Sequence, residues 1–329
     1  MQRLVRLRAL GSSARRWTSP ERSRPAVTVL LLLQAIVLGL VQGLTEFLPV
    51  SSSGHLQGVP YLLGWDSGSL AFDVMVHAGT LIAVLAHFRL ELWRMAVDAF
   101  GFGNAEPAQR RDARVLIGLL AIGTLPAAAA GLFLADTFEA AFASPRAVAG
   151  FLFLTALLLW SAERIRAQRL ANAPVETRTH ATATADVPPL PTEGLDLGRE
   201  LPSLRGRDAV AIGLAQAVAI FPGVSRAGST MAIGMALGLS RTAAARFSFL
   251  LSIPIIVGAT IFTLADLGSP EAGTLPFGLL EIAVGAAVAA GSGYWAIRFL
   301  LDLVSRRDLL VFAKYVVVFA TVLLVATFV

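Results

Sequence analysis

The sequence of 329 residues contains no cysteine and only one lysine, Lys314. The absence of cysteine excludes disulfide bonds and metal sites built on thiolates. Charged residues are also scarce, at 15% of the chain against 56% hydrophobic residues, a balance typical of an integral membrane protein and not of a soluble domain. The chain has no P-loop, no zinc-binding His-Glu-x-x-His helix and no dinucleotide-binding fingerprint, so it carries none of the usual motifs for those chemistries.

Arginine supplies almost all of the positive charge, and the formal net charge is +5. Basic and aromatic residues are not interleaved in the way that favours nucleic acid, so we expect no nucleic-acid partner. The arginine-rich connections at 89–114 and 164–207 instead indicate the positive-inside bias of a membrane protein. We therefore expect these connections in the cytoplasm, and connections without Lys or Arg, such as 136–144 and 266–276, on the outer side.

Apolar segments long enough to cross about 30 Å of hydrocarbon recur along the chain. The predicted fold class is therefore an all-α integral membrane protein, a multi-span helical bundle. Two apolar segments, Gly54–Trp65 and Met231–Leu239, are too short to span the bilayer. We predict that these two are re-entrant helical segments covered by the rest of the protein.

Composition divides the chain into four parts. Residues 1–25 form a basic arm that we expect to be disordered, and 26–163 form the first membrane repeat. Residues 164–207, rich in Pro, Thr and Ala, are predicted to be a flexible linker, and 208–329 form the second membrane repeat. A signal peptide with 27–41 as its apolar core is the alternative for the N-terminus, and it lacks a small-x-small cleavage site.

The stretch Gly39–His55, GLVQGLTEFLPVSSSGH, is the most informative part of the sequence. Gln42 and Glu46 lie four residues apart and share one face of a helix. Pro49 removes a backbone donor and should break that helix before the hydroxyl-rich Ser51–Gly54. A carboxylate within a membrane segment costs about 2.5–3.5 kcal/mol on insertion scales, which favours a functional role for it.

A second stretch repeats the first. With an offset of 174, Gly39–Gly54 aligns with Gly213–Gly228, and seven of the sixteen positions are identical. The second copy has an isoleucine where the first has Glu46, and it has Arg226 where the first has a serine. We interpret the two as an internal duplication, because paired interrupted segments are typical of a site at a repeat interface. Counting segments leaves open whether the two halves are parallel or inverted. Because an unpaired acid and an unpaired arginine are each costly within the membrane, we predict that Glu46 and Arg226 line one pocket, within about 10 Å of each other.

The second copy continues as Pro222–Thr230, PGVSRAGST. Its glycines, Gly223 and Gly228, let backbone N–H groups approach an anion, and the N-terminus of a following helix adds positive potential. Arg226 can hold a phosphate through two parallel hydrogen bonds. We therefore predict a phosphate site. The alternative is an interfacial arginine beside a helix that Ser and Thr residues cap.

Several side chains in and near the first copy are candidates for chemistry. Glu46 can accept a proton or hold a divalent cation, Ser52 can act as a nucleophile, and His55 can transfer a proton. The alternatives are a structural ion pair, a serine bonded to backbone and a buried core histidine. For Asp73 and His77, four residues apart at the start of an apolar segment, we expect helix capping and packing.

The two motifs resemble those of the undecaprenyl-diphosphate phosphatase family of the bacitracin-resistance type. The likeness rests on Gln42–His55 and Pro222–Thr230 and continues through Arg246–Pro254, covering most of residues 30–329. It implies hydrolysis of undecaprenyl diphosphate to the monophosphate and phosphate, which recycles a carrier for cell-wall synthesis. It further implies an inverted-repeat fold with two re-entrant hairpins in a bacterial plasma membrane, and an active site that faces the extracytoplasmic side.

The resemblance also assigns the site. The implied catalytic residues are Glu46, Ser52, His55 and Arg226. For phosphate binding the resemblance implies Ser225, Arg226 and Thr230, and from the two motifs we also expect Ser51, Gly228 and Ser229 to take part. A divalent cation, Mg²⁺ or Ca²⁺, is expected on Glu46 and Gln42.

Two departures from the family pattern bear on these assignments. Gln42 stands where many members have glutamate, which puts a two-carboxylate metal site in doubt, and Ala227 replaces the usual serine.

The expected partners are a polyprenyl diphosphate lipid and membrane lipid. The sequence leaves open the oligomeric state, a homo-oligomer included, and leaves open whether serine or water attacks. The alternative function is a lipid-phosphate transporter or flippase that uses the same repeat interface.

Overall fold

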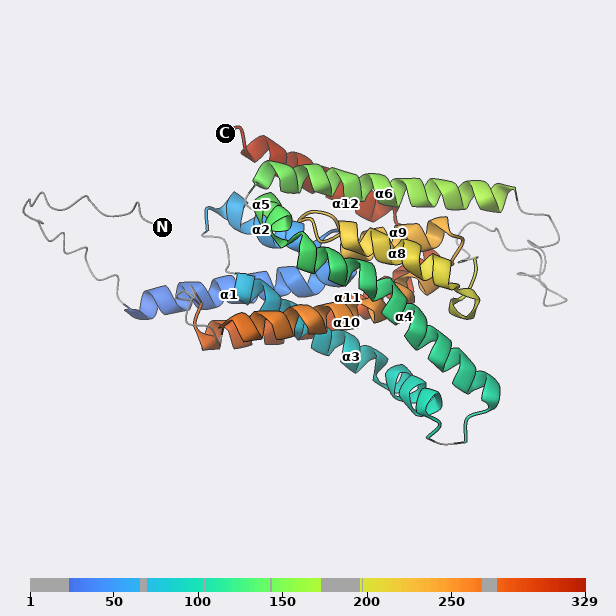
Figure 1. The fold of residues 1–329 in the computed structure, drawn as a ribbon. Coiled ribbons are helices and arrows are strands. Elements are labelled where there is room, and N and C mark those ends of the chain that lie inside the picture. Colours follow the sequence, from blue (N-terminus) through green and yellow to red (C-terminus); the bar gives the residue numbers. More distant parts are fainter. Residues whose placement is uncertain are drawn as a thin grey trace, which may run out of the picture.

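The computed structural model describes residues 24–65, 70–102, 104–142, 144–172, 196, 198–267 and 277–329 (Figure 1). Within this part of the chain the regular elements are helices, apart from one isolated bridge between Arg199 and Leu239. Most of the predicted arm and the middle of the predicted linker lie outside the described residues.

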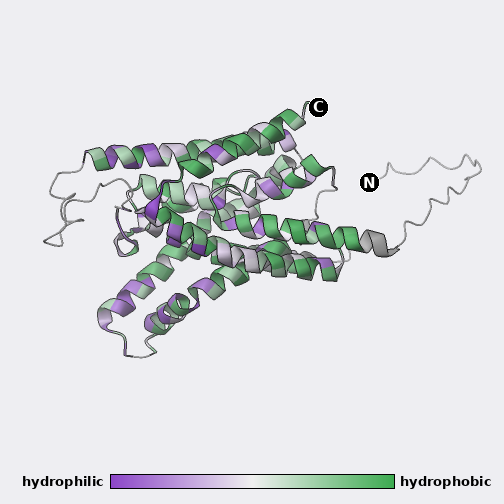
Figure 2. Cartoon of the chain, turned by 180° about the vertical axis from the view of Figure 1, so that it is seen from behind, coloured by the Kyte–Doolittle hydropathy of each residue, from purple (hydrophilic) through white to green (hydrophobic). Residues whose placement is uncertain are grey.

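Six helices of the described chain are long and apolar enough to cross a membrane. They are α1 (Arg24–Phe47), α3 (Leu70–Phe100), α4 (Pro107–Phe133), α6 (Pro145–Ala171), α10 (Arg241–Leu267) and α11 (Leu279–Arg306). The prediction of an all-α, multi-span membrane protein is therefore confirmed. Hydrophobic residues cover most of these helices, and hydrophilic ones are more frequent where α3 approaches α4 and where α6 ends (Figure 2).

The remaining elements are shorter. They are α2 (Ser52–Leu63), α5 (Ala135–Phe142), the 3₁₀ turn η1 (Leu201–Ser203), α8 (Gly206–Val218), α9 (Arg226–Ala236) and α12 (Leu310–Ala326). At 1.5 Å per residue, the 12 residues of α2 and the 11 of α9 do not reach across the hydrocarbon. The re-entrant course of these two helices and the inverted orientation of the halves remain predictions.

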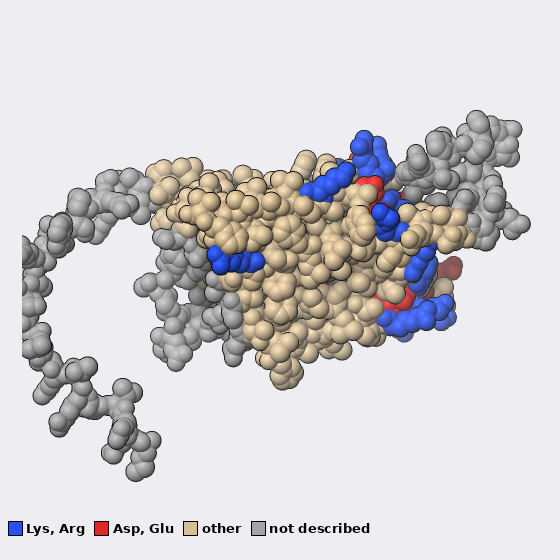
Figure 3. All heavy atoms as spheres, turned by 90° about the horizontal axis from the view of Figure 1, so that it is seen from above, with Lys and Arg blue, Asp and Glu red and all other residues tan. Residues whose placement is uncertain are grey.

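Lysine and arginine side chains gather mainly at one end of the molecule in the view of Figure 3. That end carries the C-terminal part of α6 (Figure 1). The predicted linker is partly anchored here, because Asp196 accepts hydrogen bonds from the backbone N–H groups of Arg241 and Thr242 at the start of α10.

Glycines set how closely the helices of the core approach each other. Gly39 of α1 lies against the backbone of Gly285 on α11, and Gly213 of α8 lies against the backbone of Gly123 on α4. Gly39 and Gly213 occupy equivalent positions of the two sequence motifs. Because lipid tails give no hydrophobic drive for association, such close backbone packing is a main source of helix pairing in a membrane.

We expect the substitution Gly39→Ala to lower the melting temperature of the protein in detergent. The added Cβ would lie 2.5 Å from the Gly285 carbonyl oxygen, so α1 and α11 would have to separate, at a cost of about 1–3 kcal/mol. Gly118→Ala is the matched control, because a Cβ there meets nothing within 4 Å. Equal melting temperatures for the two variants would contradict the close-packing interpretation.

Candidate active site

A cavity of about 290 Å³ lies where the two sequence motifs meet. Its wall includes Glu46 and Ser51–Ser53 from the first motif, and Val224, Ser225 and Arg226 from the second. A larger hollow of about 760 Å³ lies between α3, α4 and α10 and is lined by other residues, such as Glu91 and Arg246. The smaller cavity is therefore the candidate active site.

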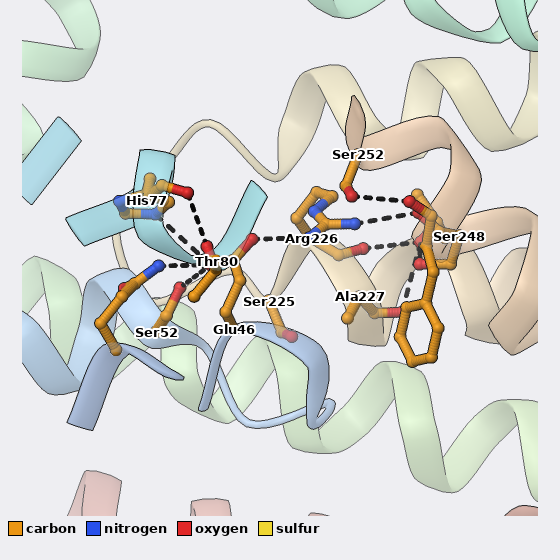
Figure 4. A network of polar contacts seen from close by, with 12 residues as sticks. Glu46, Ser52, His77, Thr80, Ser225, Arg226, Ala227, Ser248 and Ser252 are labelled. Atoms are coloured by element: carbon orange, nitrogen blue, oxygen red, sulfur yellow. Dashed lines mark hydrogen bonds and ion pairs between the residues drawn. The ribbon is translucent and has the colours of Figure 1, made fainter. Parts of the chain in front are cut away.

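Glu46 is the centre of the polar network in this cavity (Figure 4). It lies near the C-terminal end of α1 and is only 6% exposed. Its Oε1 accepts a hydrogen bond from Nη2 of Arg226 at 2.6 Å. Its Oε2 accepts from Oγ of Ser52 at 2.6 Å and from Nε2 of Gln42 at 3.1 Å. Each oxygen of a buried carboxylate is thus satisfied by a donor, as burial of a charge requires.

Arg226 is the first residue of α9, and two elements fix its guanidinium. Nη2 donates to Glu46, while Nη1 donates to the backbone carbonyl of Ser248 on α10 at 2.9 Å. The sequence predicted that Glu46 and Arg226 would line one pocket within about 10 Å of each other. That prediction is confirmed by the ion pair.

Two serines begin the short helices at the cavity. Ser51 precedes α2 and accepts from the N–H of Gly54, and Ser225 precedes α9 and accepts from the N–H of Gly228. The N-terminus of each helix therefore starts at the cavity wall, where its positive end favours an anion. The arrangement places a positive guanidinium, two helix N-termini and a hydroxyl paired with a carboxylate around one small volume.

The backbone at Ser51 is strained. Its φ of 73° makes it the one non-glycine residue of the described chain with positive φ. Such a conformation costs of the order of 1–3 kcal/mol and persists only where the surroundings hold it. Strained residues cluster at functional sites. The strain at Ser51 therefore supports a functional role for its neighbour Ser52.

The predicted site residues fall into two groups. Glu46, Ser51, Ser52, Ser225 and Arg226 come together at the cavity wall. The others are not among the residues that line it: Gln42, His55, Gly228, Ser229 and Thr230. The catalytic and binding roles assigned to both groups stay predictions.

The contacts of the second group show what each one touches. The N–H of Gly228 bonds to the Ser225 hydroxyl, and the hydroxyl of Thr230 donates to the carbonyl of Arg226 at 2.8 Å. Ser229 is buried, and its hydroxyl has no hydrogen-bond partner among the described residues. His55 faces α12, where its Nε2 lies 2.9 Å from the hydroxyl of Tyr315.

His77 is a site residue that the sequence missed. The expectation that it only packs is wrong, because its Nε2 lies 3.4 Å from Oε2 of Glu46 and it lines the cavity together with Asp73. Its Nδ1 lies 2.6 Å from the carbonyl of Asp73, which can only accept, so Nδ1 carries a proton. Nε2 donates to the Glu46 carboxylate when the ring is the doubly protonated imidazolium, the form in which the two side chains make an ion pair. Asp73 lies inside the first turn of α3, after the N-cap position, so it is not the helix cap that we expected from the sequence. The four-residue spacing was the available signal, and nothing in it pointed to Glu46.

The donor set allows a test of the expected cation. Among the described residues no group of three or more His, Asp or Glu side chains is arranged to hold a metal ion. Gln42 turns its amide nitrogen toward Glu46, as the hydrogen-bond network assigns it. The protein therefore offers the carboxylates of Glu46 and Asp73 without a complete cage. That fits a Mg²⁺-type site, in which one or two carboxylates act together with phosphate oxygens of a substrate.

Comparison with known proteins gives consistent matches over nearly the whole chain. Residues 35–322 match the model of the family described as bacitracin resistance protein BacA. The chain is 42% identical over 294 residues to undecaprenyl-diphosphatase 2 of Stutzerimonas stutzeri, covering 89% of this chain and 97% of the relative. It is 40% identical over 293 residues to the undecaprenyl-diphosphatase of Gemmatimonas aurantiaca, covering 88% and 97% respectively.

We expect His77→Leu to lower the free energy of unfolding by about 1–2 kcal/mol, because the substitution removes a donor that faces the buried carboxylate of Glu46. His77→Gln should lose less, since its amide keeps an N–H group near the same position. Thermal melting in detergent measures the difference. His87→Leu, ten residues farther along α3 and outside the cavity wall, is the control. An equal loss for the Leu and Gln variants would show that ring packing, and not the donor, matters at this position.

Proposed function

The chain belongs to the bacitracin resistance protein BacA family, and on that premise we propose that it hydrolyses undecaprenyl diphosphate to undecaprenyl phosphate and inorganic phosphate. The reaction returns a lipid carrier to cell-wall synthesis. The observation that carries the proposal is the cluster of Glu46, Ser52 and Arg226 in one cavity of a multi-pass membrane protein. The relatives reported above are named for this activity over almost the same length of chain.

Substrate binding would begin with an exchange of partners at Arg226. Its guanidinium has five donors, and Nη1 is already held by the Ser248 carbonyl, so the orientation of the fork is fixed. An entering diphosphate would displace Oε1 of Glu46 and accept the hydrogen bond from Nη2 of Arg226 in its place. The exchange replaces one anion by another at Arg226, and it frees the carboxylate of Glu46 for chemistry.

Glu46 would then act as the general base. Oγ of Ser52 already donates to Oε2 at 2.6 Å, so its proton, or that of a water in the same place, has a direct acceptor. The oxygen attacks the terminal phosphorus, the bond to the bridging oxygen breaks, and undecaprenyl phosphate leaves with the bonding electrons. If Ser52 attacks, water hydrolyses the phosphoserine in a second step.

Positive charge around the cavity would stabilise the transition state. Arg226 and the N-termini of α2 and α9, which begin at the cavity wall, would face the phosphoryl oxygens on which charge develops. A Mg²⁺ or Ca²⁺ ion, held by Glu46 and Asp73 with Gln42 one turn away, would add neutralising charge on the diphosphate.

The lipid tail needs an apolar exit from the cavity. Ile255, Ile256 and Ala259 of α10 form part of the cavity wall, and farther along the same helix Ile261 and Phe262 are exposed on the outer surface. We propose that the polyprenyl chain leaves along this face of α10 into the surrounding lipid.

We also propose that the site faces the extracytoplasmic side. Phe142 and Ala127 belong to the cavity wall; Phe142 lies within the segment 136–144, which has no Lys or Arg, and Ala127 lies in the last two turns of α4 before it. The arginine-rich connection 89–114 joins the other ends of α3 and α4. The positive-inside bias supports this orientation.

Hydrolysis and transport are separated by one assay. Purified protein in detergent, where no gradient can exist, should release inorganic phosphate from a C55 diphosphate lipid. Release should stop with a chelator and return on addition of Mg²⁺ or Ca²⁺, because carboxylates and phosphate oxygens bind the ion together. Absence of phosphate release under all of these conditions would contradict a phosphatase. Phosphate release that a chelator leaves unchanged would contradict the need for a divalent cation.

We expect Arg226→Ala to abolish phosphate release while the protein keeps its elution volume in size-exclusion chromatography. Arg226→Lys should also be poorly active, because one ammonium group cannot hold the Ser248 carbonyl and a phosphate with the geometry of a guanidinium fork. Arg306→Lys, on an exposed pair with Asp302, is the matched control and should keep full turnover. Near-normal turnover of Arg226→Lys would show that the fork is not needed.

A further inference from the structure

The second loop of the site, residues 219–225, is held from outside the cavity by α6. Thr155 of α6 is fully buried, and its hydroxyl donates to the carbonyl of Gly223 at 2.9 Å. The hydroxyl oxygen of Thr155 also accepts a hydrogen bond from the N–H of Ser225 at 2.8 Å. Gly223 has a φ of 97°, and a Cβ there would clash with the carbonyl of Val148 on α6. The loop that presents Arg226 is therefore bonded to α6 and pressed against it.

The first loop, residues 48–51, is held in a parallel way by α12. Nδ1 of His55 donates to the carbonyl of Ser51 at 2.7 Å, and its Nε2 accepts from the hydroxyl of Tyr315 on α12 at 2.9 Å. The ring of His55 also stacks on Phe319 of α12, with centroids 4.1 Å apart. Both ring nitrogens are occupied, and the ring is not part of the cavity wall. His55 thus connects the strained Ser51, next to Ser52, to α12.

The two supporting helices are themselves joined along their length. They run side by side in Figure 1. At one end, Oε1 of Glu163 on α6 accepts from the N–H of Leu309 at the start of α12, at 2.9 Å. At the other end, Arg146 of α6 donates to the carbonyl of Thr327 at 3.1 Å. A displacement of one helix relative to the other would therefore break contacts at both ends.

We propose that α6 and α12 form one scaffold that sets the position of Ser52 and Glu46 relative to Arg226. Thr155 is a positioning residue for the second loop, and Tyr315, acting through His55, is a positioning residue for the first. The proposal rests on the proposed function and assigns to His55 a positioning role in place of proton transfer. It follows from the side-chain hydrogen bonds, because α6 bonds the second loop through Thr155, α12 bonds the first loop through His55, and the two helices are tied to each other.

Catalysis is sensitive to such positioning. A misplacement of about 1 Å can lower a rate by the order of 100-fold while leaving binding of the substrate nearly intact. Loss of a support should therefore lower kcat by about 10- to 100-fold and leave KM within about a factor of two. A residue that only stabilised the fold would lower the melting temperature and the amount of active protein without this separation.

The experiment compares Thr155→Val and Tyr315→Phe with the wild type in the phosphate-release assay. Each removes hydrogen bonds with little change in shape, and each should lower kcat at nearly constant KM. Thr155→Ser should restore turnover, because its hydroxyl makes the same two hydrogen bonds. Thr321→Val is the control on α12, since the Thr321 hydroxyl bonds only its own helix at Val317. Wild-type kcat for both Thr155→Val and Tyr315→Phe would overturn the proposal.

His55 is tested by two further variants. In His55→Asn, the side-chain nitrogen replaces Nδ1 and can still donate to Ser51, but it cannot carry a proton at neutral pH. It should keep more turnover than His55→Ala, with the wild-type pH profile. Equal inactivity of both variants, or loss of one limb of the pH profile, would show that His55 transfers a proton and would overturn the positioning role.

Hydrogen exchange separates failure of the scaffold from failure of the proposed function, because it needs no turnover. Thr155→Val should speed amide exchange at 223–228 and not at 51–55, and Tyr315→Phe should do the reverse. If the wild type releases no phosphate but the exchange changes are local, the function is wrong and the scaffold stands. Unchanged exchange in both variants, or changes at both loops in each, would overturn the scaffold.

Discussion

A buried ion pair between Glu46 and Arg226 joins the two halves of this protein at the candidate site. The two residues are 180 positions apart in the sequence, and Nη2 of the arginine lies 2.6 Å from Oε1 of the glutamate. Alone in a membrane segment, each charge would cost about 2.5–3.5 kcal/mol on insertion scales. Pairing removes most of that cost, but a buried pair is weak evidence for stability, since apolar residues of the same volume often stabilise more. Its presence is better explained by the substrate that would displace one partner.

Two interruptions of helices make the pair possible. A continuous α1 would leave no room for the strained turn that brings Ser52 back to the carboxylate, and a continuous α8–α9 would not begin a new helix at Arg226. In a membrane, irregular backbone is tolerated only where protein covers it or a cavity adjoins it. Here the side chains of Ser51 and Ser225 cap the new helices, and Thr155 bonds the second loop. The same capping directs two helix N-termini at the cavity.

The sequence predicted the membrane class and the meeting of Glu46 with Arg226, because both follow from local features: long apolar runs, and two expensive charges in equivalent motifs. It did not predict that His77 faces Glu46. That contact depends on how α3 packs against α1, and a four-residue spacing with Asp73 has the same appearance in an ordinary helix start. Nor could it predict which way His55 points, because α2 has only 12 residues and polar side chains on more than one face. Its placement became visible only with Tyr315, which is 260 positions away.

The predicted duplication and the chemistry place opposite demands on the two motifs. Equivalent elements meet at the interface of related halves, so identical motifs would bring two carboxylates or two guanidiniums into one cavity of about 290 Å³. Like charges in so small a volume would repel each other, and neither combination would supply a base together with an anion clamp. The glycines at 39 and 213 and the serine caps at 51 and 225 are shared, because they build the common architecture. The acid and the guanidinium differ because a phosphatase site needs one of each, held at a distance that a diphosphate can enter.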